Sequence, residues 1–323
     1  MHKLLFVAAL VAATATPSLA EGFPVTIETG LGPVTIAQKP ERVVTWGWSA
    51  QDVVLDLGVV PVGMPFFAYG GGEDGLLPWT EEKVAAMGGV LPVILPDSAD
   101  VPVEAIAALD PDVIIAPYSG LTPEDYALLS QIAPVVAYPE RPWFATWQQV
   151  VTMTGQALGL SKEAEALVAQ TQAQMQAEAD RYPALEGLVF ANVLNRNDGT
   201  VAVRTGDDPR VRLFTDIGMV AAPDVASGVP FPGAFSYALS FENFDQLKAD
   251  ILISFFDTAA AAEAFFALPY IASTPLVQKG AYARLEGEEI TMAVSGAVTP
   301  LSLRWGFGQV IDTVGEAAAR AAD

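Results

Sequence analysis

Short apolar runs and amphipathic stretches alternate along most of this chain. Residues 23–28 and 33–36 each alternate apolar and polar side chains, which predicts a β-hairpin. A strand-like run at 42–46 then leads to a helical stretch at 50–57, which stops at Gly58. Such alternation of strands and helices is typical of α/β units around a mainly parallel sheet.

A change of pattern near the middle divides the chain into two halves. Residues 146–181 are rich in Ala, Gln, Glu and Leu, and only Gly155 and Gly159 interrupt them before Pro183. This spacing predicts one long helix or a helix pair that connects the halves. Alternation then resumes, with strands expected at 188–194, 200–205, 251–256 and 289–294 and a final helix at 301–319.

An internal repeat supports two halves of the same build. Residues 103–115 align without gaps to residues 241–253, with Glu, Leu, Asp and Ile identical at four matched positions. Each copy predicts a short amphipathic helix, a tight turn and a buried strand. We therefore predict an α/β fold of two similar lobes with mainly parallel sheets, joined by a long bridging α-helix. The predicted divisions are an N-terminal lobe at 21–145, the bridging helix at 146–182 and a C-terminal lobe at 183–323.

Residues 1–20 predict a secretory signal peptide. Lys3 precedes an apolar run at 4–13, and Ser18-Leu19-Ala20 forms a small-x-small cleavage site before Glu21. The run is too short for a membrane span, which needs about 20 apolar residues. The chain has no cysteine and therefore no lipidation point near the cleavage site. We expect a periplasmic protein that is not a lipoprotein.

Composition excludes several kinds of chemistry. The only histidine is His2, inside the predicted signal, so the mature chain has neither His nor Cys. This excludes a Cys or His zinc site, a Cys nucleophile, a Ser-His-Asp triad and a His general base. No nucleophile elbow, phosphate-binding loop or dinucleotide fingerprint is present. We therefore nominate no catalytic residue and no metal ligand, and we expect a protein that is not an enzyme.

The net charge disfavours two classes of binding partner. Lys and Arg number 16 against 38 Asp and Glu, a formal net charge of −22. Nucleic acid is disfavoured, because its binding requires basic side chains that neutralise phosphates. Anionic membrane surfaces are disfavoured for the same reason. A small molecule remains the expected ligand.

Aromatic side chains follow many of the predicted strands. Ligands of open parallel sheets bind at the carboxyl ends of the strands, so these positions are expected to line a cleft between the lobes. Any one aromatic could equally be an ordinary core or rim residue, and Arg204 could be a rim charge paired with Asp207 or Asp208. Together they suit a bulky, partly apolar small molecule. The candidate ligand contacts are Trp46, Trp48, Phe66, Tyr69, Tyr118, Arg204, Phe231, Phe235, Phe256 and Arg304.

Glu104 and Glu242 occupy the same position in the two copies of the repeat, in the first turn of each predicted helix. A favourable interaction with the helix dipole, about 0.3–1 kcal/mol, would explain either glutamate alone. It explains the matched offset less well, since Asp or Ser would serve equally. The alternative is a pair of surface carboxylates, one per lobe, that meet a basic partner.

Several segments resemble one family in their order and spacing. The chain resembles the periplasmic substrate-binding proteins of ABC importers for ferric siderophores and cobalamin. The resemblance covers nearly the whole mature chain, and Val277 stands where that family often has Trp. It rests on Pro40-Glu41-Arg42-Val43-Val44 and on residues 57–64, 103–115, 126–136 and 274–279.

The resemblance implies two rigid α/β lobes bridged by a long helix, with a shallow cleft and modest closure. It also implies that Glu104 and Glu242 dock onto arginines of an inner-membrane permease. Residues 118–124 and 231–237 look most like the ferric hydroxamate binders, in which Tyr118 and Phe231 or Phe235 would contact the ligand. Those binders carry an Arg shortly before the first repeat, whereas this chain has Asp97 and Asp100 there.

These observations lead to one functional hypothesis with two rivals. We expect a non-catalytic, monomeric periplasmic receptor that delivers a preformed iron–siderophore chelate, with hydroxamates favoured, to an ABC importer. An acidic protein with few cleft arginines suits a neutral or cationic chelate better than a tri-anionic catecholate. No resident cofactor is expected. The first alternative is a haem or cobalamin receptor, in which haem would need a Tyr axial ligand. A more distant alternative is an exported hydrolase that uses carboxylates.

Overall fold

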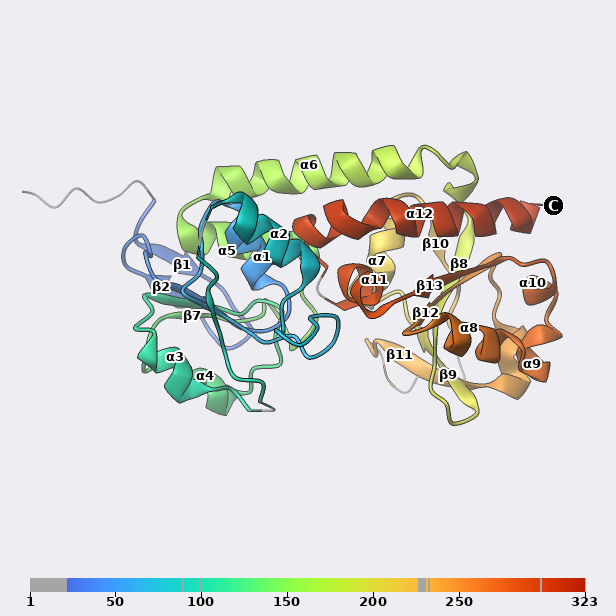
Figure 1. Cartoon of the computed structure of the whole chain (residues 1–323), viewed down its shortest axis with the longest axis horizontal. Helices are drawn as coiled ribbons and strands as arrows, with labels where there is room; N and C mark the ends of the chain where they lie inside the picture. The colour runs from blue at the N-terminus through green and yellow to red at the C-terminus, as the bar shows by residue number, and fades with distance from the viewer. Residues whose placement is uncertain are drawn as a thin grey trace, which may run out of the picture.

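The computed structural model describes residues 22–88, 90–98, 100–225, 231, 233–296 and 298–322. Two α/β lobes lie side by side, and helices α6 (Ser161–Ala179) and α12 (Pro300–Ala322) run along one side of the pair (Figure 1). This arrangement confirms the predicted fold class. The predicted signal peptide lies outside the described residues. Within the described part of the chain, no helix is both long and apolar enough to cross a membrane.

The N-terminal lobe is built on five parallel strands in the order β5-β4-β3-β6-β7. The predicted hairpin is confirmed, since β1 (Val25–Ile27) and β2 (Val34–Ile36) pair antiparallel. The strands of the sheet are β3 (Val43–Thr45), β4 (Gly63–Met64), β5 (Val93–Ile94), β6 (Val113–Ile115) and β7 (Val135–Val136). The helices are α1 (Ala50–Asp56), α2 (Pro78–Ala86), α3 (Val103–Ala108) and α4 (Pro123–Leu129).

The C-terminal lobe has a mixed sheet in the order β11-β9-β8-β12-β13, with β10 also paired to β8. The pairs β8–β9 and β9–β11 are antiparallel, and the others are parallel. Its strands are β8 (Val189–Asn195), β9 (Thr200–Arg204), β10 (Val220–Ala221), β11 (Ser236–Ser240), β12 (Ile251–Phe256) and β13 (Tyr282–Glu286). Its short helices are η1 (Pro183–Leu185), α7 (Pro209–Thr215), η2 (Phe241–Gln246), α8 (Ala259–Phe266), α9 (Pro269–Ala272), α10 (Pro275–Gln278) and α11 (Glu288–Thr291).

The internal repeat folds into two similar units. In the first copy α3 leads into β6, and in the second the 3₁₀ helix η2 leads into β12. Every residue of β6 and β12 is buried, as expected for central strands covered on both faces.

The predicted connector is a helix pair rather than one continuous helix. Helix α5 (Trp147–Leu158) ends at Gly159, whose φ of 67° is a left-handed conformation that favours glycine. Helix α5 packs against α1, β1, β6 and β7 of the N-terminal lobe, whereas α6 packs against α5 and α12. The span between lobes is therefore made by α6, with α12 beside it.

The strand expected at 289–294 is wrong. Those residues form the end of α11 and the π-helical turn η3 (Met292–Gly296), and the last strand is β13. Ile290 and residues 292–294 are buried, and η3 packs against α12, so apolar side chains dominate the segment. Periodicity alone does not distinguish such a run from a buried strand.

Two carboxylates of α1 hold the start of α12. Buried Asp52 accepts hydrogen bonds from Trp79 Nε1 (2.7 Å), Thr80 Oγ1 (2.6 Å) and Thr299 Oγ1 (2.9 Å). Burial raises the pKa of Asp52 to about 6, although these hydrogen bonds lower it. One turn later, Asp56 accepts two hydrogen bonds from Arg304, at 2.5 and 2.7 Å. The N-terminal lobe is thus fastened to the helix that covers the C-terminal sheet.

Candidate functional site

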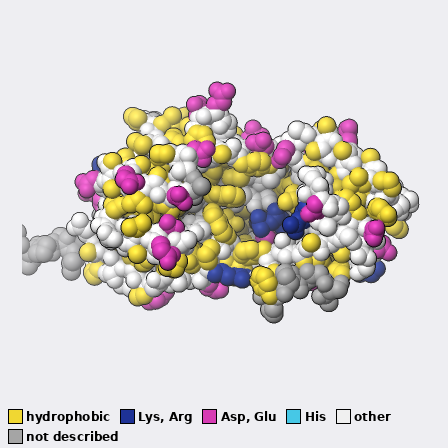
Figure 2. All heavy atoms as spheres, turned by 90° about the horizontal axis from the view of Figure 1, so that it is seen from below, with side chains coloured by type: hydrophobic (Ala, Val, Ile, Leu, Met, Phe, Trp, Pro, Cys, Tyr) yellow, Lys and Arg dark blue, Asp and Glu magenta, His cyan; other side chains and the backbone are white. Residues whose placement is uncertain are grey.

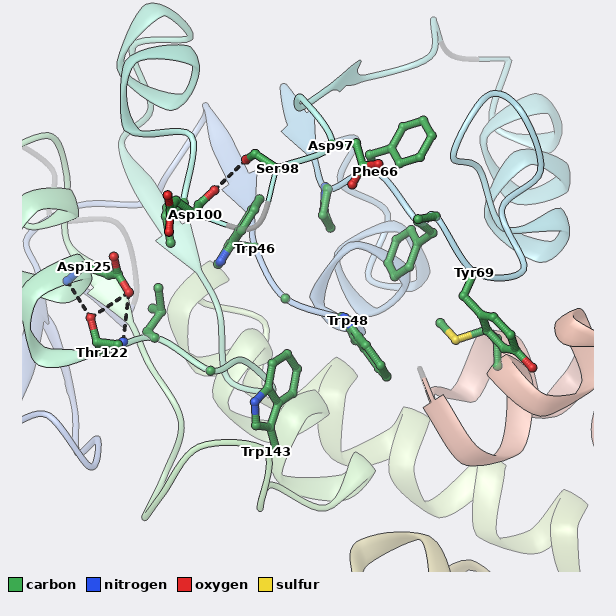
Figure 3. A pocket seen from close by; sticks show the side chains of 18 residues that line it. Trp46, Trp48, Phe66, Tyr69, Asp97, Ser98, Asp100, Thr122, Asp125 and Trp143 are labelled. Atoms are coloured by element: carbon green, nitrogen blue, oxygen red, sulfur yellow. Dashed lines mark hydrogen bonds between the residues drawn. The ribbon is translucent and has the colours of Figure 1, made fainter. Parts of the chain in front are cut away.

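A cavity of about 500 Å³ lies at the carboxyl ends of the N-terminal strands (Figure 3). Trp46 directly follows β3, Pro65 directly follows β4, and residues 120–122 follow β6. This is the edge at which open parallel sheets bind ligands. Among the described residues that line the cavity, Met292 alone comes from the C-terminal half.

Aromatic rings form the wall of this cavity. The rings of Trp48 and Trp143 lie 5.3 Å apart, and Tyr118 meets Trp143 edge-on at 5.5 Å. Trp143 has a φ of 61°, a left-handed conformation that is rare for a bulky side chain. A Cβ atom at Gly120 would lie 2.7 Å from Trp143 Nε1, so glycine is required for this packing. The indole of Trp143 is therefore held in a fixed position.

Three carboxylates border the aromatic wall. Asp97, Asp100 and Asp125 line the cavity, and its described lining contains no Lys or Arg. Asp125 Oδ2 also accepts hydrogen bonds from Thr122 in the capping box of α4. Among the described residues, no group of three or more His, Asp or Glu side chains is placed to hold a metal ion. The carboxylates of the lining favour neutral or cationic groups of a ligand over anionic ones.

The C-terminal lobe contributes a buried group of charges. Asp208 accepts hydrogen bonds from Arg210 Nε (2.7 Å) and Nη2 (2.6 Å), and its Oδ2 lies 3.3 Å from Arg204 Nη1. Burial would raise the pKa of Asp208, but the arginines lower it overall. Burial and the neighbouring Arg210 lower the pKa of Arg204 to about 10, so it stays charged near neutral pH. Figure 2 shows basic side chains meeting apolar ones in the hollow between the lobes.

Hydrogen bonds and aromatic contacts join the lobes across the cleft. Tyr69 Oη donates a hydrogen bond to Asp257 Oδ1 at 2.5 Å. Elsewhere Phe144 and Phe235 stack at 5.5 Å, and the Arg141 guanidinium lies 3.9 Å from the centre of the Phe144 ring. Burial and the bond to Asp257 raise the pKa of Tyr69 to about 12, which keeps the phenol protonated.

The structure brings some of the predicted ligand contacts together and separates others. Trp46, Trp48, Phe66 and Tyr69 line the cavity, and Tyr118 packs behind Trp143. Arg204 lies in the C-terminal charge group, paired with the Asp208 that the sequence offered as its partner. Phe235 stacks on Phe144, and Phe231 is 59% exposed.

Phe256 and Arg304 also lie outside the lining of this cavity. Phe256 is buried against Phe265 and Phe266 in the core of the C-terminal lobe. Arg304 lies on α12 and pairs with Asp56, where it fastens the helix.

Phe67 and Trp143 also follow predicted strands but are not among the candidate contacts given above. Other lining residues outside that set are Asp97, Asp100, Asp125 and Met292. Trp143 follows β7, the same strand-end signal that selected Trp46. The Thr122–Asp125 capping box marks the start of α4 in the sequence. Met292 carries no such signal, because the bend of η3 delivers it from the other half.

Glu104 and Glu242 are both exposed, one on α3 and one on η2. Their docking role stays a prediction.

The sequence is similar to that of known periplasmic binding proteins. A model of the periplasmic binding protein family matches residues 43–286. The Fe(3+) dicitrate-binding periplasmic protein FecB of Escherichia coli is 28% identical over 169 residues, which cover 51% of this chain. The match spans 52%, about half, of the length of that relative.

Solved structures resemble the chain over nearly its whole length. The substrate-binding protein PiaA of an iron uptake ABC transporter from Streptococcus pneumoniae is 32% identical, with a TM-score of 0.79 over 92% of this chain and 100% of that one. In complex with ferrichrome, PiaA gives 31% identity and a TM-score of 0.82 over 91% of this chain and 99% of that one. A periplasmic solute-binding protein from Mycobacterium smegmatis is 26% identical, with a TM-score of 0.76 over 91% and 98%.

Proposed function

The chain belongs to the periplasmic binding protein family, and from this premise we propose that it captures an iron–siderophore chelate and delivers it to an inner-membrane ABC importer. The observation that carries the proposal is the cavity of about 500 Å³, walled by Trp46, Trp48 and Trp143 at the ligand-binding edge of a parallel sheet. The iron arrives as cargo already coordinated by the siderophore. The protein therefore acts as a receptor without catalysis.

We favour a ferric hydroxamate as the ligand class. Three hydroxamate anions neutralise Fe³⁺, so the coordinated core carries no charge, and aromatic rings bind such a compact, partly apolar body. A tri-anionic catecholate complex would instead meet Asp97, Asp100 and Asp125. The likeness to PiaA in complex with ferrichrome supports the same class.

Ferric citrate is the second candidate. Arg204 and Arg210 offer the guanidinium groups that a carboxylate ligand requires, and FecB is a partial relative. Asp208 already neutralises part of this charge, which favours the hydroxamate.

Haem is disfavoured. With no histidine in the mature chain, an axial ligand would have to be a phenolate. Burial and Asp257 raise the pKa of Tyr69, and burial raises that of Tyr118, so both phenols stay protonated.

Tryptophan fluorescence tests the proposal, because three of the six tryptophans line the cavity. We expect ferrichrome or a ferrioxamine to quench the emission at micromolar concentrations, and a ferric catecholate, haem or cobalamin to act only at much higher ones. Trp48→Phe should reduce the quenching, whereas Trp305→Phe, which changes an indole outside the cavity, should leave it nearly intact. The proposal fails if no ferric chelate changes the emission at micromolar levels.

We further propose that Glu104 and Glu242 dock the loaded receptor onto basic residues of the permease. Both are exposed, and the repeat gives each lobe one of them. The double variant Glu104→Ala/Glu242→Ala should abolish uptake of ferric hydroxamate by cells while its chelate affinity stays unchanged. Glu124→Ala on α4 serves as a surface control. A loss of affinity in the double variant would contradict the docking role.

A further inference from the structure

A second, much smaller cavity lies between the lobes behind the aromatic wall. Its volume is about 20 Å³, enough for a single water molecule, which needs at least about 10–15 Å³. Ser49, Tyr118 and Trp147 line it from the N-terminal side, and Arg210 lines it from the C-terminal side. The remaining described lining is carbon-rich: Ala145, Val150, Pro209, Gly296 and Val298.

The hydroxyl of Ser49 does not make the hydrogen bond that is usual for a serine at the N-terminus of a helix. Ser49 is the N-cap of α1, yet its side chain makes no capping hydrogen bond. An N-cap serine ordinarily accepts a hydrogen bond from the first turn of the helix, at a gain of about 1 kcal/mol. The residue is 1% exposed, and its Oγ has no hydrogen-bond partner among the described residues. A buried hydroxyl in this position calls for another partner.

Trp147 presents a second such group in the same cavity. The residue is 6% exposed, and its Nε1 has no hydrogen-bond partner among the described residues. Trp79 provides the contrast within the chain, because its equally buried Nε1 donates to Asp52 at 2.7 Å. An indole N–H is a donor only, so the partner that Trp147 needs is an acceptor.

Arg210 and Tyr118 complete the set. Arg210 uses Nε and Nη2 to bind Asp208, which leaves the Nη1 protons uncommitted in the described structure. Tyr118 also lines the cavity, and burial raises the pKa of its phenol, so the hydroxyl keeps its proton. The lining therefore offers two obligate donors, Trp147 and Arg210, and two hydroxyls that either donate or accept.

We infer that this cavity is a hydration site for one water molecule, which accepts from Trp147 Nε1 and Arg210 and donates to the hydroxyls of Ser49 and Tyr118. A water molecule has two sites for accepting and two protons for donating, which matches this set of four groups. Asp208 compensates one of the two guanidinium charges of Arg204 and Arg210, so the replacement of chloride by bromide described below separates water from an anion. The water joins both lobes and orients the hydroxyl of Tyr118 behind the aromatic wall.

Nuclear magnetic resonance of the whole chain without ligand, labelled at the tryptophan indoles, tests the site. Trp147→Phe identifies the Trp147 Nε1–H resonance, and Ser49→Ala, which should shift that resonance most, identifies it independently if the first variant does not fold. We expect a cross-relaxation peak between Trp147 Nε1–H and a long-lived water. Trp79 Nε1–H should show none, because its partner is Asp52. The water is ruled out if Trp147 behaves like Trp79, or if the Trp147 resonance moves when bromide replaces chloride, which would identify an anion.

A second arm rests on the proposed function and measures ferrichrome affinity. Loss of one bridging hydrogen bond in Ser49→Ala should weaken binding about threefold to tenfold through Tyr118. Thr152→Ala, on the exposed face of α5, is the control and should bind ferrichrome like the unchanged protein. If Ser49→Ala binds ferrichrome with unchanged affinity while the water signal is present, the water has no role in binding. The hydration site itself is then still supported. If ferrichrome does not bind the unchanged protein, the proposed function fails while the water signal still decides the site.

Discussion

The two lobes share a sequence repeat, but the side chains that they present to the cleft differ in chemistry. The N-terminal lobe presents an aromatic cavity bordered by Asp97, Asp100 and Asp125 at the end of a wholly parallel sheet. The C-terminal lobe presents Arg204 and Arg210, both tied to Asp208, beside a mixed sheet. Under the proposed function, we expect the N-terminal lobe to hold the body of the ligand. The C-terminal lobe would face the ligand with arginines whose charge Asp208 neutralises only in part.

The largest effect on this difference between the lobes is expected from removal of the Asp208 carboxylate. Asp208→Asn keeps a side chain that can cap α7 but leaves two buried guanidinium groups without a counter-charge. We expect the free energy of unfolding to fall by about 3–5 kcal/mol, measured by urea denaturation. Binding of ferric citrate should become tighter relative to ferrichrome. Asp207→Asn, next to it in an exposed turn, should change neither quantity.

The joint between the lobes should depend on pH through Asp52. Its pKa is raised from 3.8 to about 6 in the folded protein, so the folded state binds this proton more tightly than the unfolded state. The contribution of Asp52 to stability is therefore complete below about pH 4 and is lost as the pH rises through 6. Relative to Asp52→Asn, the unchanged protein should lose about 2 kcal/mol of unfolding free energy between pH 4 and 7. Equal pH profiles for the two proteins would contradict this assignment.

A pair of aromatic truncations compares the lobes directly. Trp143→Ala removes the ring that contacts Trp48 and Tyr118, and should weaken ferrichrome binding by about 2 kcal/mol, roughly 30-fold. Phe235→Ala, in the C-terminal lobe, should weaken it less, because Phe235 stacks on Phe144 outside the cavity. Equal losses measured by calorimetry would show that the two lobes share the ligand evenly.

The smallest expected effect is at the contact between Tyr69 and Asp257. Tyr69→Phe keeps the aromatic ring in the cavity and removes one partly exposed hydrogen bond between the lobes. We expect a loss of about 0.5–1.5 kcal/mol in unfolding free energy and little change in affinity. A large loss of affinity instead would place the hydroxyl against the ligand.

Local patterns in the sequence predicted much of this fold. The hairpin, the repeat and the helix pair follow from alternation, matched spacing and Gly159, all of which act over a few residues. The strand-end position of Trp46, Trp48 and Tyr69 likewise placed them in the cavity. The segment at 289–294 was misread because burial beneath α12 makes a helix as apolar as a strand. Asp97 and Asp100 lie in a loop whose path depends on contacts distant in sequence, so their place in the cavity has no local signal.

The carboxylates of α1 have a mechanical consequence. Asp52 and Asp56 bind α12 to the N-terminal lobe by accepting hydrogen bonds from Thr299 and Arg304. Helix α6 also spans the two lobes. Parting the lobes breaks hydrogen bonds to a buried charge, so under the proposed function we expect the protein to bind its ligand with little relative motion of the two lobes. Under the same proposal, release of the ligand would require the importer to separate the two lobes.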